Sequence, residues 1–130
     1  VNDRLAILDP VDGAERAALL TRCALLAMPS RSENFGNSLL EAMAAGRPVI
    51  TTPGVGLAQE ISRADAGLVV EGQPDALAGA IREILGDPAR AQAMGQRGQE
   101  TALRDYGWPQ IAERMATVYR EIVQANGRRS

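Results

Sequence analysis

Two glutamates, Glu33 and Glu41, flank a short polar stretch around Gly36, just before an apolar helical pattern. Carboxylates accept hydrogen bonds from sugar hydroxyls. The start of a helix collects unpaired N–H groups and a partial positive charge, so it suits a phosphate. Two carboxylates beside such a helix start could therefore hold both ends of a sugar nucleotide.

A purely structural role explains the same two glutamates. Ser30-x-x-Glu33 and Ser38-x-x-Glu41 both match the capping box, in which a serine hydroxyl and a glutamate carboxylate satisfy backbone N–H groups at a helix start. Such a cap contributes about 1 kcal/mol to helix stability. Spacing alone leaves ligand binding and capping open for each glutamate.

Short apolar runs alternate with amphipathic patterns before residue 71, and these predict the elements that position the glutamates. The predicted strands are Leu5–Leu8, Leu25–Met28, Val49–Thr51 and Leu68–Val70. The predicted helices between them are Gly13–Arg22, Asn37–Ala45 and Leu57–Ser62. This alternation indicates right-handed crossovers and an α/β, Rossmann-like three-layer domain with about four parallel strands.

The rest of the chain is predicted to be helical. The expected helices are Pro74–Leu85, 88 to about 104, and Pro109–Gln124. Residues 1–125 form one predicted domain, and 126–130 a flexible tail. Ligands of doubly wound sheets bind beyond the carboxyl ends of strands. Residues 29–36 follow the predicted strand Leu25–Met28, which places both glutamates at that edge.

Composition excludes several classes of function. The net charge is −2 without a Lys/Arg run, so nothing predicts nucleic-acid binding, and no apolar stretch is long enough to span a bilayer. There is no histidine and one cysteine, which excludes a Ser-His-Asp triad within the chain, an internal disulfide and most zinc sites. Catalysis here would use carboxylates, backbone amides, hydroxyls or arginine.

A long ordered pattern surrounds the two glutamates, which are separated by seven residues. Residues 33–36 read Glu-Asn-Phe-Gly, 40–44 read Leu-Glu-Ala-Met-Ala, 45–50 read Ala-Gly-Arg-Pro-Val-Ile, and 66–70 read Ala-Gly-Leu-Val-Val. With these motifs, the stretch from Leu5 to about Ile122 resembles the C-terminal, donor-binding domain of retaining glycosyltransferases with the GT-B fold. The closest resemblance is to the glycosyl transferases group 1 family.

The resemblance implies a role for each position. A glutamate at the position of Glu33 contacts the donor sugar's hydroxyls, which marks Glu33 as the catalytic candidate, and one at Glu41 hydrogen-bonds the ribose. Asn34 belongs to the same donor-binding motif. Backbone amides cradle the distal phosphate at four positions: Phe35, Gly36, Asn37 and Ser38. Two residues border the base: Leu8 and Val11.

The resemblance also implies a chemistry. Such enzymes move a sugar from a UDP-, GDP- or ADP-sugar to an acceptor with retention, by a front-face displacement, and without a bound metal or other cofactor. The protein's task is then to stabilise the negative charge that develops on the leaving diphosphate. Cytoplasmic localisation is implied too, or a peripheral membrane location through the acceptor domain.

The chain departs from the family pattern in three ways. Asp9-Pro10 stands where a glycine is frequent, and residues 54–60 are a variant of the usual Gly-rich turn, with Glu60 read as a surface or capping residue. The family's diphosphate-clamping Arg and Lys, and its acceptor domain, would lie upstream of Leu5. Arg31 and Arg47 are not obvious substitutes for that pair. We therefore expect a portion of a larger enzyme that is inactive alone. The alternatives are a nucleotide-sugar epimerase of the same architecture and a non-catalytic interaction module.

Overall fold

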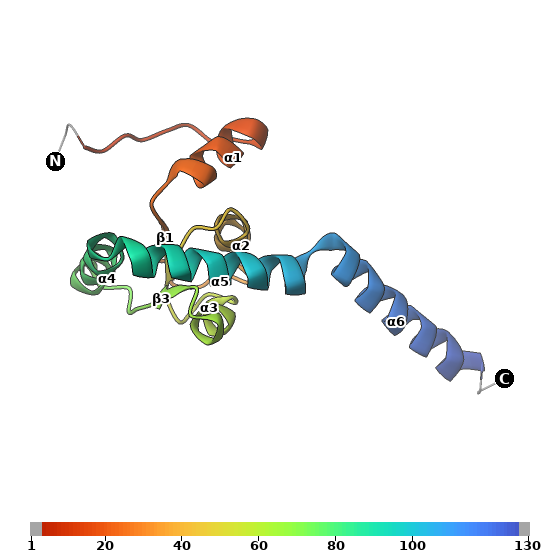
Figure 1. Ribbon diagram of the computed structural model, residues 1–130. Coiled ribbons are helices and arrows are strands. Elements are labelled where there is room, and N and C mark those ends of the chain that lie inside the picture. The colour runs from red at the N-terminus through yellow and green to blue at the C-terminus, as the bar shows by residue number, and fades with distance from the viewer. Residues whose placement is uncertain (1–3, 128–130) are drawn as a thin grey trace.

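Three short parallel strands form the centre of the structure, a computed structural model that describes residues 4–127 (Figure 1). The strands are β1 (Leu26–Met28), β2 (Val49–Thr51) and β3 (Gly67–Val69). The helices are α1 (Gly13–Arg22), α2 (Asn37–Ala44), α3 (Ala58–Ala64), α4 (Pro74–Gly86), α5 (Pro88–Tyr106) and α6 (Trp108–Gly127). The alternation of strands with helices as far as β3, followed by helices alone, matches the prediction.

The strand order is β1-β2-β3, with Ala27 opposite Ile50 and Ile50 opposite Leu68. Every residue of β2 is buried, because this strand is paired on both edges and covered on both faces. Val49 belongs to a core that α2 and α3 help to form, whereas Ile50 packs into a second core with α4 and the first turns of α5. The predicted three-layer α/β arrangement is confirmed.

Helix α5 joins the two cores, and Figure 1 shows it lying across α4, α2 and α3. A Cβ on Gly95 would lie 2.1 Å from the carbonyl oxygen of Gly46, so only glycine allows this approach. The Gln99 amide donates to the carbonyl of Ala44 at 2.9 Å. Since Ala44 and Gly46 precede β2, the middle of α5, around Gly95 and Gln99, lies on the side of the sheet where β2 begins.

The predicted strand Leu5–Leu8 is wrong. These residues have irregular backbone, and the side chains of Leu5, Ile7 and Leu8 are 64%, 91% and 59% exposed. A strand is stable only when a neighbour accepts its hydrogen bonds, and this segment extends from α1 away from the sheet (Figure 1). The described sheet therefore has three strands instead of about four.

Helix α6 continues beyond its predicted end and projects from the rest of the molecule in Figure 1. It contacts α5, and its apolar side chains Trp108 and Val123 are 83% and 70% exposed. The first two residues of the predicted tail 126–130 belong to this helix, and 128–130 lie outside the described residues. Within residues 4–127, no helix is both long and apolar enough to cross a membrane.

Candidate functional site

The candidate site is the loop of residues 29–36 between β1 and α2, at the carboxyl end of the sheet. Gly36 ends the loop with a φ of 95°, a left-handed conformation that favours glycine. A Cβ there would also lie 3.1 Å from the side chains of Leu39, Met28 and Val55. Gly36 is thus required by its backbone conformation and by the core beneath it, rather than only by approach to a ligand.

Backbone hydrogen bonds join this loop to residues 54–57. The Glu33 amide donates to the Gly54 carbonyl at 3.2 Å, and the Gly56 amide donates to the Glu33 carbonyl at 3.0 Å. The Leu57 amide donates to the Phe35 carbonyl at 3.1 Å. Both glycines are needed for this approach, because a Cβ on Gly54 or Gly56 would lie 2.1 Å from a carbonyl oxygen of the facing loop. Both the N–H and the C=O of Glu33 are therefore bonded to the facing loop.

Two buried threonines hold the base of the loop. Thr51 Oγ1 donates to the Met28 carbonyl at 3.1 Å, and Thr52 Oγ1 donates to the Ser30 carbonyl. Thr51 is the last residue of β2 and bonds to the end of β1, whereas Thr52 follows β2 and bonds to the loop after β1. The site loop is thus attached to the sheet by side chains as well as by backbone.

An aromatic pair supports the middle of the loop. The rings of Phe35 and Tyr106 lie with centroids 5.6 Å apart and planes tilted by 59°, a favourable arrangement. Tyr106 is the last residue of α5, and its pKa is raised mainly by burial, with Glu60 and Asp105 adding to the effect. The loop is therefore packed against α5 although 70 residues separate the two rings in sequence.

The start of α2 presents free N–H groups. Gly36 is the N-cap, and its carbonyl accepts from the amides of Leu39 and Leu40. Within residues 4–127, the amides of Gly36, Asn37 and Ser38 donate no backbone hydrogen bond. With the partial positive charge of a helix start, these amides form an anion-binding arrangement.

The capping alternative does not hold for either glutamate. Gly36 precedes α2, so Ser38 lies inside the helix, and no side chain caps this helix start. Ser30 lies in a loop with no helix in the following six residues. The structure therefore removes the main structural explanation for the positions of Glu33 and Glu41.

The two glutamates lie in different environments. Glu33 is exposed, as are Asn34, Asn37 and Ser38 around it. Glu41 is half-buried, and its Oε1 lies 3.3 Å from Nη2 of Arg16 on α1. Its other oxygen, Oε2, is inaccessible to solvent and has no hydrogen-bond partner among the described residues.

Comparison with known proteins identifies the family. A family model described as "Glycosyl transferases group 1" matches residues 1–101. The chain belongs to this family. It is 32% identical over 123 residues to a D-inositol 3-phosphate glycosyltransferase of Corynebacterium urealyticum, and 36% identical over 110 residues to a glycogen synthase of Mycobacterium tuberculosis. These alignments cover 94% and 84% of this chain, and 29% and 27% of the two relatives.

Solved structures of glycosyltransferases share the fold. A sucrose-phosphate synthase from Thermosynechococcus elongatus superposes with a TM-score of 0.87 at 35% identity, over 95% of this chain and 31% of that one. WaaG, a glycosyltransferase involved in lipopolysaccharide biosynthesis, gives a TM-score of 0.62 at 30% identity, over 69% and 25% of the two chains. The predicted family and fold are confirmed, and the chain spans under a third of the length of these relatives.

Four further residues singled out from the sequence of this glycosyltransferase family member lie outside the site loop. Leu8 is exposed and Val11 half-buried, both in the irregular segment that leads into α1, so their contact with a base stays a prediction. Glu60 lies in α3, with its carboxylate 3.7 Å from Arg63, in agreement with a surface role. Arg47 Nη1 donates to the Cys23 carbonyl at 3.3 Å, before β1 and away from the loop.

Four residues that support the site were not predicted from the sequence: Arg16, Thr51, Thr52 and Tyr106. The pair of threonines at the end of a buried strand was a usable signal, because hydroxyls in a core need partners. No sequence signal marked Arg16 or Tyr106, because they belong to helices distant in sequence from their partners Glu41 and Phe35.

Proposed function

We propose that this chain is the donor-binding part of a retaining glycosyltransferase that moves a sugar from a nucleoside diphosphate sugar to an acceptor. The observation that carries the proposal is the set of free amides at the start of α2, which follows β1 and is flanked in sequence by Glu33 and Glu41. Membership of the glycosyl transferases group 1 family supports it.

Each part of the site has a role in this proposal. The amides of residues 35–38 bind the distal phosphate and stabilise the charge that develops when the sugar leaves. Glu33, exposed on a loop whose backbone is bonded to residues 54–57, accepts hydrogen bonds from the sugar and is the catalytic candidate. Glu41, one helical turn after Asn37, accepts hydrogen bonds from the ribose. Leu8 and Val11 border the base.

The donor nucleotide, the acceptor and the location follow as part of the same proposal. The names of the relatives point to different products, among them a sucrose phosphate and glycogen, so the base is sought among UDP, GDP and ADP. The acceptor is bound by a part of the enzyme that corresponds to the unmatched portion of the relatives. The enzyme works in the cytoplasm, and no metal is required. The epimerase alternative has no observation in its favour.

The isolated chain is proposed to be inactive. It spans under a third of the length of its relatives, and a transfer reaction needs an acceptor held against the donor sugar. An assay of this chain alone with each sugar nucleotide should show no transfer. Turnover by the 130-residue chain would contradict this part of the proposal.

Calorimetry on the longer protein, meaning the proposed enzyme with its acceptor-binding part, tests the roles of the two glutamates in donor binding. A carboxylate hydrogen-bonded to hydroxyls contributes about 1.5–3 kcal/mol, so Glu41→Ala should weaken nucleoside diphosphate binding by about ten- to a hundredfold. Glu33→Ala should mainly weaken binding of the intact sugar nucleotide. Glu121→Ala, which removes an exposed carboxylate of α6, is the matched control and should change neither affinity. Failure of the unmutated protein to bind any of the three nucleotides would favour the interaction-module alternative.

A further inference from the structure

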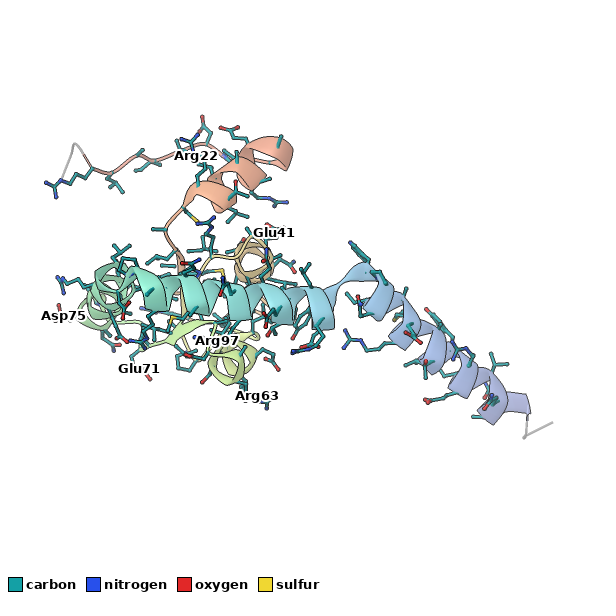
Figure 2. The ribbon with its side chains drawn as sticks, viewed as in Figure 1. Arg22, Glu41, Arg63, Glu71, Asp75 and Arg97 are labelled. Carbon is teal, nitrogen blue, oxygen red and sulfur yellow. The ribbon has the colours of Figure 1, made fainter. Side chains whose placement is uncertain are left out.

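A cation contacts the proposed ribose site from outside the motif. Arg16, in the first turn of α1, places Nη2 3.3 Å from Oε1 of Glu41. Helices α1 and α2 border a cavity of about 250 Å³, which Arg16 and Glu41 both line. Figure 2 shows Glu41 on the side of α2 nearer to α1. The ion pair therefore joins α1 to the site residue that is proposed to meet the ribose.

The ion pair between Arg16 and Glu41 can be broken at little cost in stability. Arg16 is 51% and Glu41 37% exposed, and pairs this exposed contribute little to stability. Glu41 Oε2 is covered and lacks a donor among residues 4–127, which is unfavourable for a carboxylate oxygen. Helix α1 has no buried residue, so a small adjustment of α1 costs little core packing. Ribose hydroxyls can thus replace Arg16 on the carboxylate and satisfy the second oxygen.

The displaced guanidinium would be well placed for phosphate. Glu41 lies one helical turn, about 6 Å along the axis, from Asn37, whose free amide begins the anion-binding helix start. The α-phosphate of a nucleotide is bonded to the same ribose that Glu41 holds. Arginine binds phosphate through its planar fork of N–H donors.

We propose that Arg16 is a further donor-binding residue, which rests on Glu41 in the free protein and moves to the diphosphate when ribose hydroxyls take its place. This inference rests on the proposed function, because it needs the ribose at Glu41. Arg31, which belongs to the site loop itself, lines a separate cavity with Glu71 and forms no ion pair with Glu33 or Glu41 among the described residues. The exchange moves no covalent bond and needs no cofactor.

Binding of paired ligands to the longer protein tests this exchange. Each pair of probes is a nucleoside diphosphate and its nucleoside: UDP with uridine, GDP with guanosine, or ADP with adenosine. The pair that binds the unmutated protein is then used with the variants. Arg16→Gln should weaken diphosphate binding about three- to tenfold, because a charged contact to phosphate is lost. The same variant should bind the nucleoside no more weakly than before, because the ribose no longer competes with a cation for Glu41. Arg16→Lys, which keeps the charge, should restore most of the diphosphate affinity.

Arg22→Gln is the matched control, since Arg22 is exposed at the opposite end of α1 (Figure 2). It should leave both affinities unchanged. Equal weakening of nucleoside and diphosphate by Arg16→Gln would make Arg16 a support for Glu41 and overturn the proposal, as would unchanged diphosphate binding. Glu41→Gln separates this failure from failure of the proposed function. If Glu41→Gln weakens the nucleoside while Arg16→Gln alters nothing, the ribose site stands and only the role of Arg16 falls.

Discussion

Replacing Gly56 by alanine should separate the two loops that form the site. A Cβ at this position would lie 2.1 Å from the carbonyl oxygen of Asn34, whereas real Cβ contacts essentially never fall below 3.0 Å. The loops must therefore move apart by about 1 Å. The obstacle is backbone, which cannot rotate away as a side chain would.

The expected cost follows from the bonds that this movement strains. Three backbone hydrogen bonds of 3.0–3.2 Å join residues 33–35 to residues 54–57, and each contributes about 0.5–1.5 kcal/mol. Losing one or two of them, with some distortion of the loop, should destabilise the protein by about 2 kcal/mol. For a domain of this size, that corresponds to a fall of about 8 °C in Tm.

Thermal unfolding followed by far-UV circular dichroism measures the effect. Gly79→Ala is the matched control, because Gly79 lies inside α4 and a Cβ there meets nothing within 4 Å. That variant should gain about 0.5–1 kcal/mol from helix propensity and raise Tm by a few degrees. A Gly56→Ala protein that unfolds within 1 °C of the unmutated one, or that binds the sugar nucleotide equally well, would refute the close approach of the two loops.

Three further outcomes are expected. Phe35→Ala should lower the urea midpoint by an amount equivalent to about 1–3 kcal/mol, because a half-buried ring leaves the core and its contact with Tyr106, and Phe35→Leu should lower it less. Burial, Glu60 and Asp105 raise the pKa of Tyr106 above 10.0, so the folded protein holds this proton more tightly than the unfolded chain, and the resulting stability is present below pH 10 and lost as pH rises through the folded pKa. Tyr106→Phe should therefore lessen the fall in Tm above pH 10, and an identical profile would show that another group titrates there. Since we propose transfer without a metal, the longer enzyme should keep its activity in EDTA, and a loss that Mg²⁺ or Mn²⁺ reverses would argue against it.

Much of the local structure could be predicted because it is encoded over short distances. The start of α2 at Asn37, its end before Gly46, and the strand Val49–Thr51 follow from periodicity and punctuation by glycine and proline. The strand at Leu5–Leu8 could not be judged in this way, because an apolar run becomes a strand only if an edge is available to pair with it. The capping boxes failed for a related reason, since a cap depends on where the helix begins, and α2 begins two residues too early for Ser38 to be its N-cap.

The sequence by itself determined the family, the α/β layering and the placement of Glu33 and Glu41 around a helix start, because those features depend on residues close together in the chain. Only the tertiary structure decided what holds them. The facing loop with Gly54 and Gly56, the ring of Tyr106 and the guanidinium of Arg16 reach the site from segments that are distant in sequence. Close approach of backbones and pairing of charges depend on distances in space, which a pattern of residue types along one segment does not specify.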